Sequence, residues 1–84
     1  MKWTLIYRPD AANELARIWL DAIDRQAIAN AANRIDRQLA TAPLVVGESR
    51  ESNSRILFEG PLTVFYDVNE QDRQVTVWAV VYRE

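Results

Sequence analysis

The chain offers few side chains that could carry out acid–base chemistry near neutral pH. It contains no histidine and no cysteine. Histidine is the side chain best suited to proton transfer near pH 7 and the commonest metal ligand, and a thiolate is a frequent alternative nucleophile. A hydrolase built on a Ser–His or Cys–His pair is therefore excluded. We expect neither a metal ion nor another cofactor.

The remaining candidates are arginines of the second half and the carboxylates beside them. Arg50 lies between Glu48 and Glu51, so a carboxylate there could serve as a general base next to a cation, although such a cluster is more often a solvated loop. Arg55 could clamp an anion, or it could form a salt bridge, which is the more frequent role. The possible partners are Glu48, Glu51 and Glu59.

Tyr82 and Arg83 close the last apolar segment of the chain. Arg83 could face a phosphate or a carboxylate of a protein partner, or it could be a solvated strand end. The candidate catalytic residues are therefore Arg50, Arg55, Tyr82 and Arg83.

The charge distribution disfavours general binding to nucleic acid. The net charge is −2, and residues 1–8, 9–42, 43–53 and 54–84 carry +2, −1, −1 and −2. Affinity for a polyanion comes mainly from lysines and arginines gathered against phosphates. No segment supplies such a cluster.

Residue patterns predict a strand and then two helices in the first half. Residues 2–8 alternate as a strand does, and Pro9 ends them. The next apolar stripe has helical period, and we expect all of it in the core; it consists of Leu15, Ile18, Trp19 and Ala22. Asp24 can cap a second helix that ends before Pro43. The break near residues 23–25 has no Gly or Pro, so one long bent helix is the alternative.

The second half predicts a connector, residues 43–53, and three strands over Arg55–Glu59, Leu62–Val68 and Gln74–Tyr82. Strands joined by short turns are antiparallel neighbours. The order β-α-α-β-β-β then makes a two-layer α+β domain spanning residues 1–84, with a helical hairpin packed on an antiparallel sheet.

The last strand is apolar on both of its faces. Val75, Val77, Ala79 and Val81 alternate with Thr76, Trp78, Val80 and Tyr82. Because two helices cover only one face of a sheet, the other is exposed or is covered by a partner. Trp3 and Trp78 are more often core residues, but either would be a binding anchor on that open face. The free chain could also dimerise through a strand edge.

Neither a signal peptide nor a membrane span is apparent. The N-terminal ten residues reach a proline and an acid, and no apolar stretch is long enough to cross a bilayer. We expect a cytoplasmic location.

Two segments together resemble the RelE/ParE toxins. The first is Tyr7-Arg8-Pro9-Asp10-Ala11 with Glu14-Leu15, Ile18-Trp19 and Ile23, and the second runs from Gly47 through Arg55-Ile56-Leu57, Val64-Phe65-Tyr66-Asp67-Val68 and Val77-Trp78-Ala79-Val80-Val81-Tyr82-Arg83. Each motif is weak, but their order and spacing cover nearly the whole chain.

The resemblance implies the toxin of a type II toxin–antitoxin pair, of the plasmid-stabilisation or chromosomal kind, held inactive by a cognate antitoxin. One branch of the family cleaves mRNA on the ribosome, by attack of a 2′-hydroxyl on the adjacent phosphate. That reaction needs a base, an acid and a cation. The other branch poisons DNA gyrase.

The chain departs from the RNA-cleaving branch at four places. Thr63 stands where an arginine usually precedes the tyrosine, here Tyr66, by three residues. Tyr82 stands where the family often has a histidine or lysine. The family's connector is basic, whereas the charges of residues 47–51 sum to −1. The C-terminal segment that supplies a late catalytic tyrosine in some members does not follow Glu84. The resemblance therefore favours a toxin that acts by binding. A nuclease with atypical residues and a non-toxic partner-binding module are the alternatives.

Overall fold

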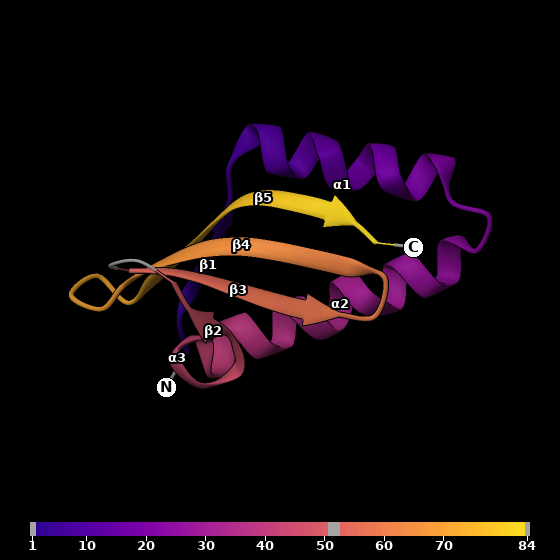
Figure 1. Cartoon of the computed structure of the whole chain (residues 1–84). Coiled ribbons are helices and arrows are strands. Elements are labelled where there is room, and N and C mark those ends of the chain that lie inside the picture. The colour runs from indigo at the N-terminus through magenta and orange to yellow at the C-terminus, as the bar shows by residue number, and fades with distance from the viewer. Residues whose placement is uncertain (1, 51–52, 84) are drawn as a thin grey trace.

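The computed structural model describes residues 2–50 and 53–83, and it places three helices against a five-stranded sheet (Figure 1). This arrangement confirms the predicted two-layer α+β architecture. The elements in chain order are β1 (Thr4–Tyr7), α1 (Pro9–Asp21), α2 (Arg25–Thr41), α3 (Pro43–Val46), β2 (Glu48–Ser49), β3 (Ser54–Glu59), β4 (Leu62–Asn69) and β5 (Gln74–Tyr82).

The sheet has the strand order β1-β5-β4-β3-β2. The neighbouring pairs β2–β3, β3–β4 and β4–β5 are antiparallel, as the short turns predict, whereas β1 is parallel to β5. A parallel neighbour requires a crossover, and the helical hairpin α1–α2 provides it. The first and last strands therefore lie side by side, a pairing that the sequence patterns did not predict.

Two separate helices form the hairpin, so the alternative of one long bent helix is wrong. Pro9 is the first residue of α1, and α1 ends where Ala22 adopts an extended conformation. The Asp24 carboxylate accepts a hydrogen bond from the Ala27 amide at 3.1 Å and so caps α2. This cap is what separates the helices in the absence of Gly or Pro.

The connector over residues 43–53 contains more structure than expected. Pro43 starts the single turn α3, and Glu48–Ser49 forms the short edge strand β2 against β3. The Tyr66 hydroxyl donates to the Pro43 carbonyl oxygen at 2.7 Å. Tertiary contact with β4 thus fixes a segment whose own pattern indicated only a loop.

A β-bulge in β5 overturns part of the predicted alternation. Tyr66 pairs with Val77 but Phe65 pairs with Ala79, so Trp78 is an extra residue in β5. Val75 and Val77 face the helices before the bulge, and beyond it Val80 takes their place in the core. A bulge shifts the face of every later side chain, so Ala79 and Val81 do not share the face of Val77.

Trp19 is not a core residue, contrary to the expectation from its stripe. It is 40% exposed, and the Arg25 guanidinium lies 4.8 Å from its ring centroid. Helix α1 buries only Ala11 and Ile18 fully, since it packs chiefly on β5 near the sheet edge. Of the apolar stripe predicted for this helix, only Ile18 is therefore fully buried in the core.

The core lies between the helical hairpin α1–α2 and the sheet. Its largest fully buried side chains include Tyr66, Ile35, Leu39, Leu62 and Val64. Ala31 is also fully buried, and its small side chain allows α2 to approach the strands closely. Within the described residues, no helix has the length and hydropathy required to cross a membrane.

Candidate functional site

The sheet face opposite the core carries a set of large apolar side chains. They alternate with the core residues of the three central strands, and they are Ile56, Phe58, Phe65, Trp78 and Val81. Phe58, Trp78 and Val81 are 43%, 40% and 47% exposed. We call these five residues together with Thr63 the open face. The prediction that the sheet face away from the helices is partly apolar is confirmed, and Trp78 is the tryptophan that lies on it.

Aromatic packing gives the open face a defined shape. The ring centroids of Phe65 and Trp78 are 5.3 Å apart with planes at 41°. A shallow hollow of about 260 Å³ lies beside them, bordered also by Arg50, Ser54 and Arg55. Large aromatic side chains that are half-exposed and held by their neighbours are typical anchors of protein interfaces.

Thr63 sits at the centre of this face. Its direct neighbours across the sheet are Phe58 and Val81, and it is only 5% exposed. Its hydroxyl oxygen has no hydrogen-bond partner among the described residues. The position that the resemblance assigns to a phosphate-binding cation therefore holds a short neutral side chain under apolar neighbours.

Arg55 ties the connector to the sheet. It pairs with Tyr66 in the register of β3 and β4, and its guanidinium donates to the Gly47 carbonyl oxygen. Burial raises the pKa of Tyr66 above its usual value, and the nearby Arg55 charge offsets part of this shift. A Cβ at Gly47 would lie 2.2 Å from the Tyr66 hydroxyl oxygen, so this tight contact requires glycine.

The expected salt bridge of Arg55 is not found with two of its three named partners. Glu48 is 3.4 Å from Arg50, and Glu59 is 2.7 Å from Arg34. The third, Glu51, lies outside the described residues. The Glu48–Arg50 pair is well exposed at both ends, as a solvated loop would be, and such pairs contribute little.

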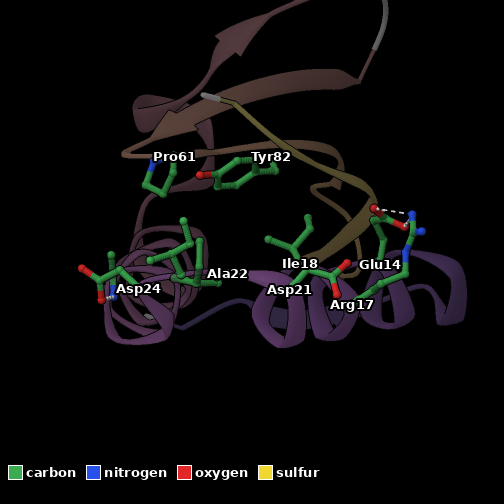
Figure 2. A pocket seen from close by; sticks show the side chains of 11 residues that line it. Glu14, Arg17, Ile18, Asp21, Ala22, Asp24, Pro61 and Tyr82 are labelled. Carbon is green, nitrogen blue, oxygen red and sulfur yellow. Dashed lines mark hydrogen bonds and ion pairs between the residues drawn. The ribbon is translucent and has the colours of Figure 1, made fainter.

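Tyr82 and Arg83 point to different sides of the sheet. Tyr82 borders a groove of about 470 Å³ between α1, α2 and the β3–β4 turn (Figure 2). The Arg83 guanidinium lies 5.1 Å from the Phe58 ring centroid, at the edge of the open face, and donates to the Gly60 carbonyl oxygen at 3.1 Å.

The four candidate residues do not form one constellation. Arg50 and Arg55 border the hollow near Ser54, and Arg83 lies beside Phe58, four residues further along β3. Four strand residues span about 13 Å. Attack on a phosphate needs base, acid and cation around one atom. The four candidate residues therefore do not surround one reacting atom.

The open face could be expected from the sequence because the strands carry apolar residues on both of their faces. That signal did not identify Phe58 or Phe65 individually, because which alternate residues face the helices depends on register and on the bulge. The groove beside Tyr82 had no signal in the sequence, since it is made by residues from three separate parts of the chain.

The fold is shared with solved toxin–antitoxin structures. A chain of the RelBE2 complex of Mycobacterium tuberculosis superposes with a TM-score of 0.80 at 19% identity, covering 99% of this chain and 100% of that one. The isolated RelE toxin of E. coli gives 0.70 at 14% identity, covering 98% and 85%.

The chain has the RelE/ParE toxin fold. A chain of the chromosomal ParDE system of P. aeruginosa also matches, with a TM-score of 0.67 at 18% identity and coverage of 98% and 97%. No protein-family model matches the sequence, and no curated protein matches it either. The predicted resemblance is thus confirmed for the fold, and both the RelE and the ParE kinds share it with this chain.

Proposed function

We propose that the chain is a single toxin domain of a type II toxin–antitoxin pair that acts by binding a macromolecular target, as a gyrase poison does. The open face supports this proposal. At the position where an RNA-cleaving toxin would need a cation, Thr63 lies among Phe58, Phe65 and Val81. Loss of one anion-stabilising donor alone reduces turnover by about 10²–10³.

The proposed partner in the resting state is a cognate antitoxin. The RelBE2, ParDE and E. coli RelBE structures are toxin–antitoxin systems or complexes with this fold. Exposed aromatic surface of this kind is usually covered by a partner, because a monomer rarely leaves such a patch free.

Induced expression of the chain in a bacterial host tests the proposal. The expected result is growth arrest with an SOS response and gyrase-linked DNA breaks. Arrest accompanied by mRNA cleavage on the ribosome would instead identify a nuclease with atypical residues. Normal growth at every induction level would leave a non-toxic partner-binding module.

Variants of the open face connect the effect to the surface. Phe58→Ala and Trp78→Ala should weaken toxicity strongly, because anchors of this kind contribute about 2 kcal/mol or more to binding. Both side chains are roughly half-exposed, so the fold should survive. The matched control is Val45→Ala, since Val45 is 81% exposed on α3, away from the open face. Equal toxicity of all three variants would reject the open face as the target-binding surface.

A further inference from the structure

The open face has opposite charges at its two ends. Arg83 lies at one end, beside the ring of Phe58. Asp67 lies at the other end and is exposed, four residues beyond Thr63 on β4. Because side chains of a strand alternate between its two faces, Thr63, Phe65 and Asp67 point to the same side of the sheet. Within residues 2–50 and 53–83, neither Arg83 nor Asp67 forms a salt bridge.

The other charges near Asp67 leave that end negative. Glu48 pairs with Ile56 in the register of β2 and β3, so it shares the side of the open face. Arg50 lies 3.4 Å from Glu48, and these two charges offset each other. The guanidinium of Arg55 is directed to the connector, where it donates to a carbonyl oxygen. The Asp67 end therefore sums to −1, and the Arg83 end carries +1.

The spacing of these charges suits a two-fold arrangement. Strand β4 lies between β3 and β5, and Phe65 is midway between Thr63 and Asp67 on it (Figure 1). Each half of that span is about 7 Å long. A two-fold axis across the strands at the level of Phe65 would set the Arg83 end of one copy over the Asp67 end of the other. Both oppositely charged contacts then form at once, because a two-fold interface repeats every contact.

The centre of the open face supplies the apolar part of such an interface. Phe65 and Trp78 pack against each other near the level of the axis, and Phe58 and Val81 flank them. Ile6 of β1 is 40% exposed and continues the apolar surface toward the sheet edge, since it pairs with Thr76 and so lies on the same side as Asp67. Two sheets that pack face to face interdigitate side chains of this kind across about 10 Å.

The size of the face indicates a weak and reversible pair. Four strands spaced about 4.8 Å apart and about 20 Å of their length make a small footprint. Interfaces that bury about 1,200 Å² or less in total belong to transient complexes. The net charge of −2 on each copy opposes the pairing only slightly, because charges more than about 8 Å apart are screened at physiological salt.

We infer that the open face is also the interface of a symmetric homodimer, in which Phe65 and Trp78 of two copies pack centre to centre and Arg83 of each copy meets Asp67 of the other. The pairing goes beyond the proposed function, since it covers the same surface in the free chain without antitoxin or target. It does not require that the chain be toxic.

Sedimentation equilibrium of the full chain between about 5 and 500 µM tests the inference, and the expected result is a monomer–dimer equilibrium with a Kd of about 10–100 µM. Amide chemical shifts of Phe65, Trp78 and Val81 should change on dilution. A chain that stays monomeric throughout would overturn the inference. So would a dimer whose dilution shifts fall on the helices or only along an edge strand.

Matched apolar variants locate the interface. Trp78→Ser should weaken the dimer about tenfold or more, and Phe58→Ser provides a second variant should Trp78→Ser fail to fold by circular dichroism. Leu20→Ser is the control, because Leu20 is 57% exposed on α1, away from the open face, and its Kd should change less than about twofold. Equal effects of the open-face variants and the control would overturn the inference.

Charge reversal tests the two-fold arrangement. Arg83→Glu and Asp67→Arg should each weaken self-association about tenfold at low salt, because two like-charge contacts replace two attractive ones. An equal mixture of these two variants should dimerise about as well as the parent chain, since both contacts are attractive in the mixed pair. The controls are Glu70→Arg on the β4–β5 turn and Arg37→Glu on α2, and neither should change the Kd more than about twofold. No gain in association on mixing would refute the arrangement.

The outcome is separable from that of the proposed function, because self-association is measured on the purified chain and toxicity in a growing host. A toxic chain that stays monomeric would refute only the homodimer. A chain that dimerises through the open face but does not arrest growth would support the homodimer and refute only the proposed function.

Discussion

The contact between Gly47 and Tyr66 gives the sharpest prediction about stability. A Cβ at residue 47 would lie 2.2 Å from the Tyr66 hydroxyl oxygen, 3.0 Å from its Cζ and 3.1 Å from the Ile56 carbonyl oxygen. Gly47 itself has φ −98°, which any residue adopts. The effect of Gly47→Ala is therefore purely steric.

The expected loss for Gly47→Ala is about 2–4 kcal/mol in the free energy of unfolding. Overpacking of a filled site costs about 1–3 kcal/mol. Displacing the Tyr66 ring would also break its hydrogen bond to Pro43, which contributes about 0.5–1.5 kcal/mol. Tyr66 is fully buried, so it has no free space into which to move.

Urea unfolding followed by tryptophan fluorescence measures this loss, and two further variants test its cause. Gly60→Ala is the control, because Gly60 has φ +55° and a Cβ there would make only ordinary contacts, 3.5 Å from Arg34 and 3.9 Å from Ala31, so only backbone strain of about 1 kcal/mol is expected. Tyr66→Phe removes the hydroxyl that clashes with the new Cβ. The double variant Gly47→Ala/Tyr66→Phe should therefore lose about 1–2 kcal/mol less stability than the sum of the losses of the two single variants. Gly47→Ala within 0.5 kcal/mol of the parent chain, or full additivity with Tyr66→Phe, would refute the steric argument.

Three further predictions concern single side chains. Burial, and after it a hydrogen bond to the Asp36 carboxylate, raises the pKa of Tyr7. The contribution of Tyr7 to the free energy of unfolding should therefore be fully present below about pH 10 and decrease above it. Unfolding measurements between pH 8 and 11 check this, because Tyr7→Phe should flatten the decrease. The hydrogen bond from Arg34 lowers the pKa of Glu59, so the contribution of Glu59 to stability should be present at neutral pH and be lost as the pH falls through this lowered pKa. Glu59→Gln should therefore lose about 1 kcal/mol at pH 7 and less in acid, as unfolding measurements at neutral and acidic pH would show. Ile18→Ala should cost about 2–4 kcal/mol and Trp19→Ala less than about 1.5, and a larger loss at Trp19 in thermal unfolding would contradict its exposed position.

The sequence by itself determined the fold class and the order of the longer elements, although it missed the short α3 and β2. Pro9 marks the start of the first helix, Pro43 follows the end of the second, Asp24 separates the two helices, and the turn around Gly60 joins antiparallel strands. These signals are local, because each depends on the backbone chemistry of a few neighbouring residues. The absence of histidine and cysteine likewise excludes whole classes of active site without any structure.

Side-chain positions that depend on distant parts of the chain were predicted less well. The salt bridge of Arg55 and the burial of Trp19 were both inferred from neighbours in sequence. Arg55 instead meets Gly47 across the connector, and Trp19 lies beside Arg25 at the hairpin tip. In each case a tertiary contact, rather than local spacing, selects the partner.

Only the tertiary structure decided which residues share a surface. The extra residue Trp78 in β5 shifts the alternation, so Val81 joins Thr63 on the open face while Tyr82 turns toward the helices. A bulge depends on how two strands fit together, and periodicity within one strand does not contain that information. The groove beside Tyr82 is a still less local feature, since Ile18, Ile28 and Pro61 meet only after the hairpin has packed on the sheet.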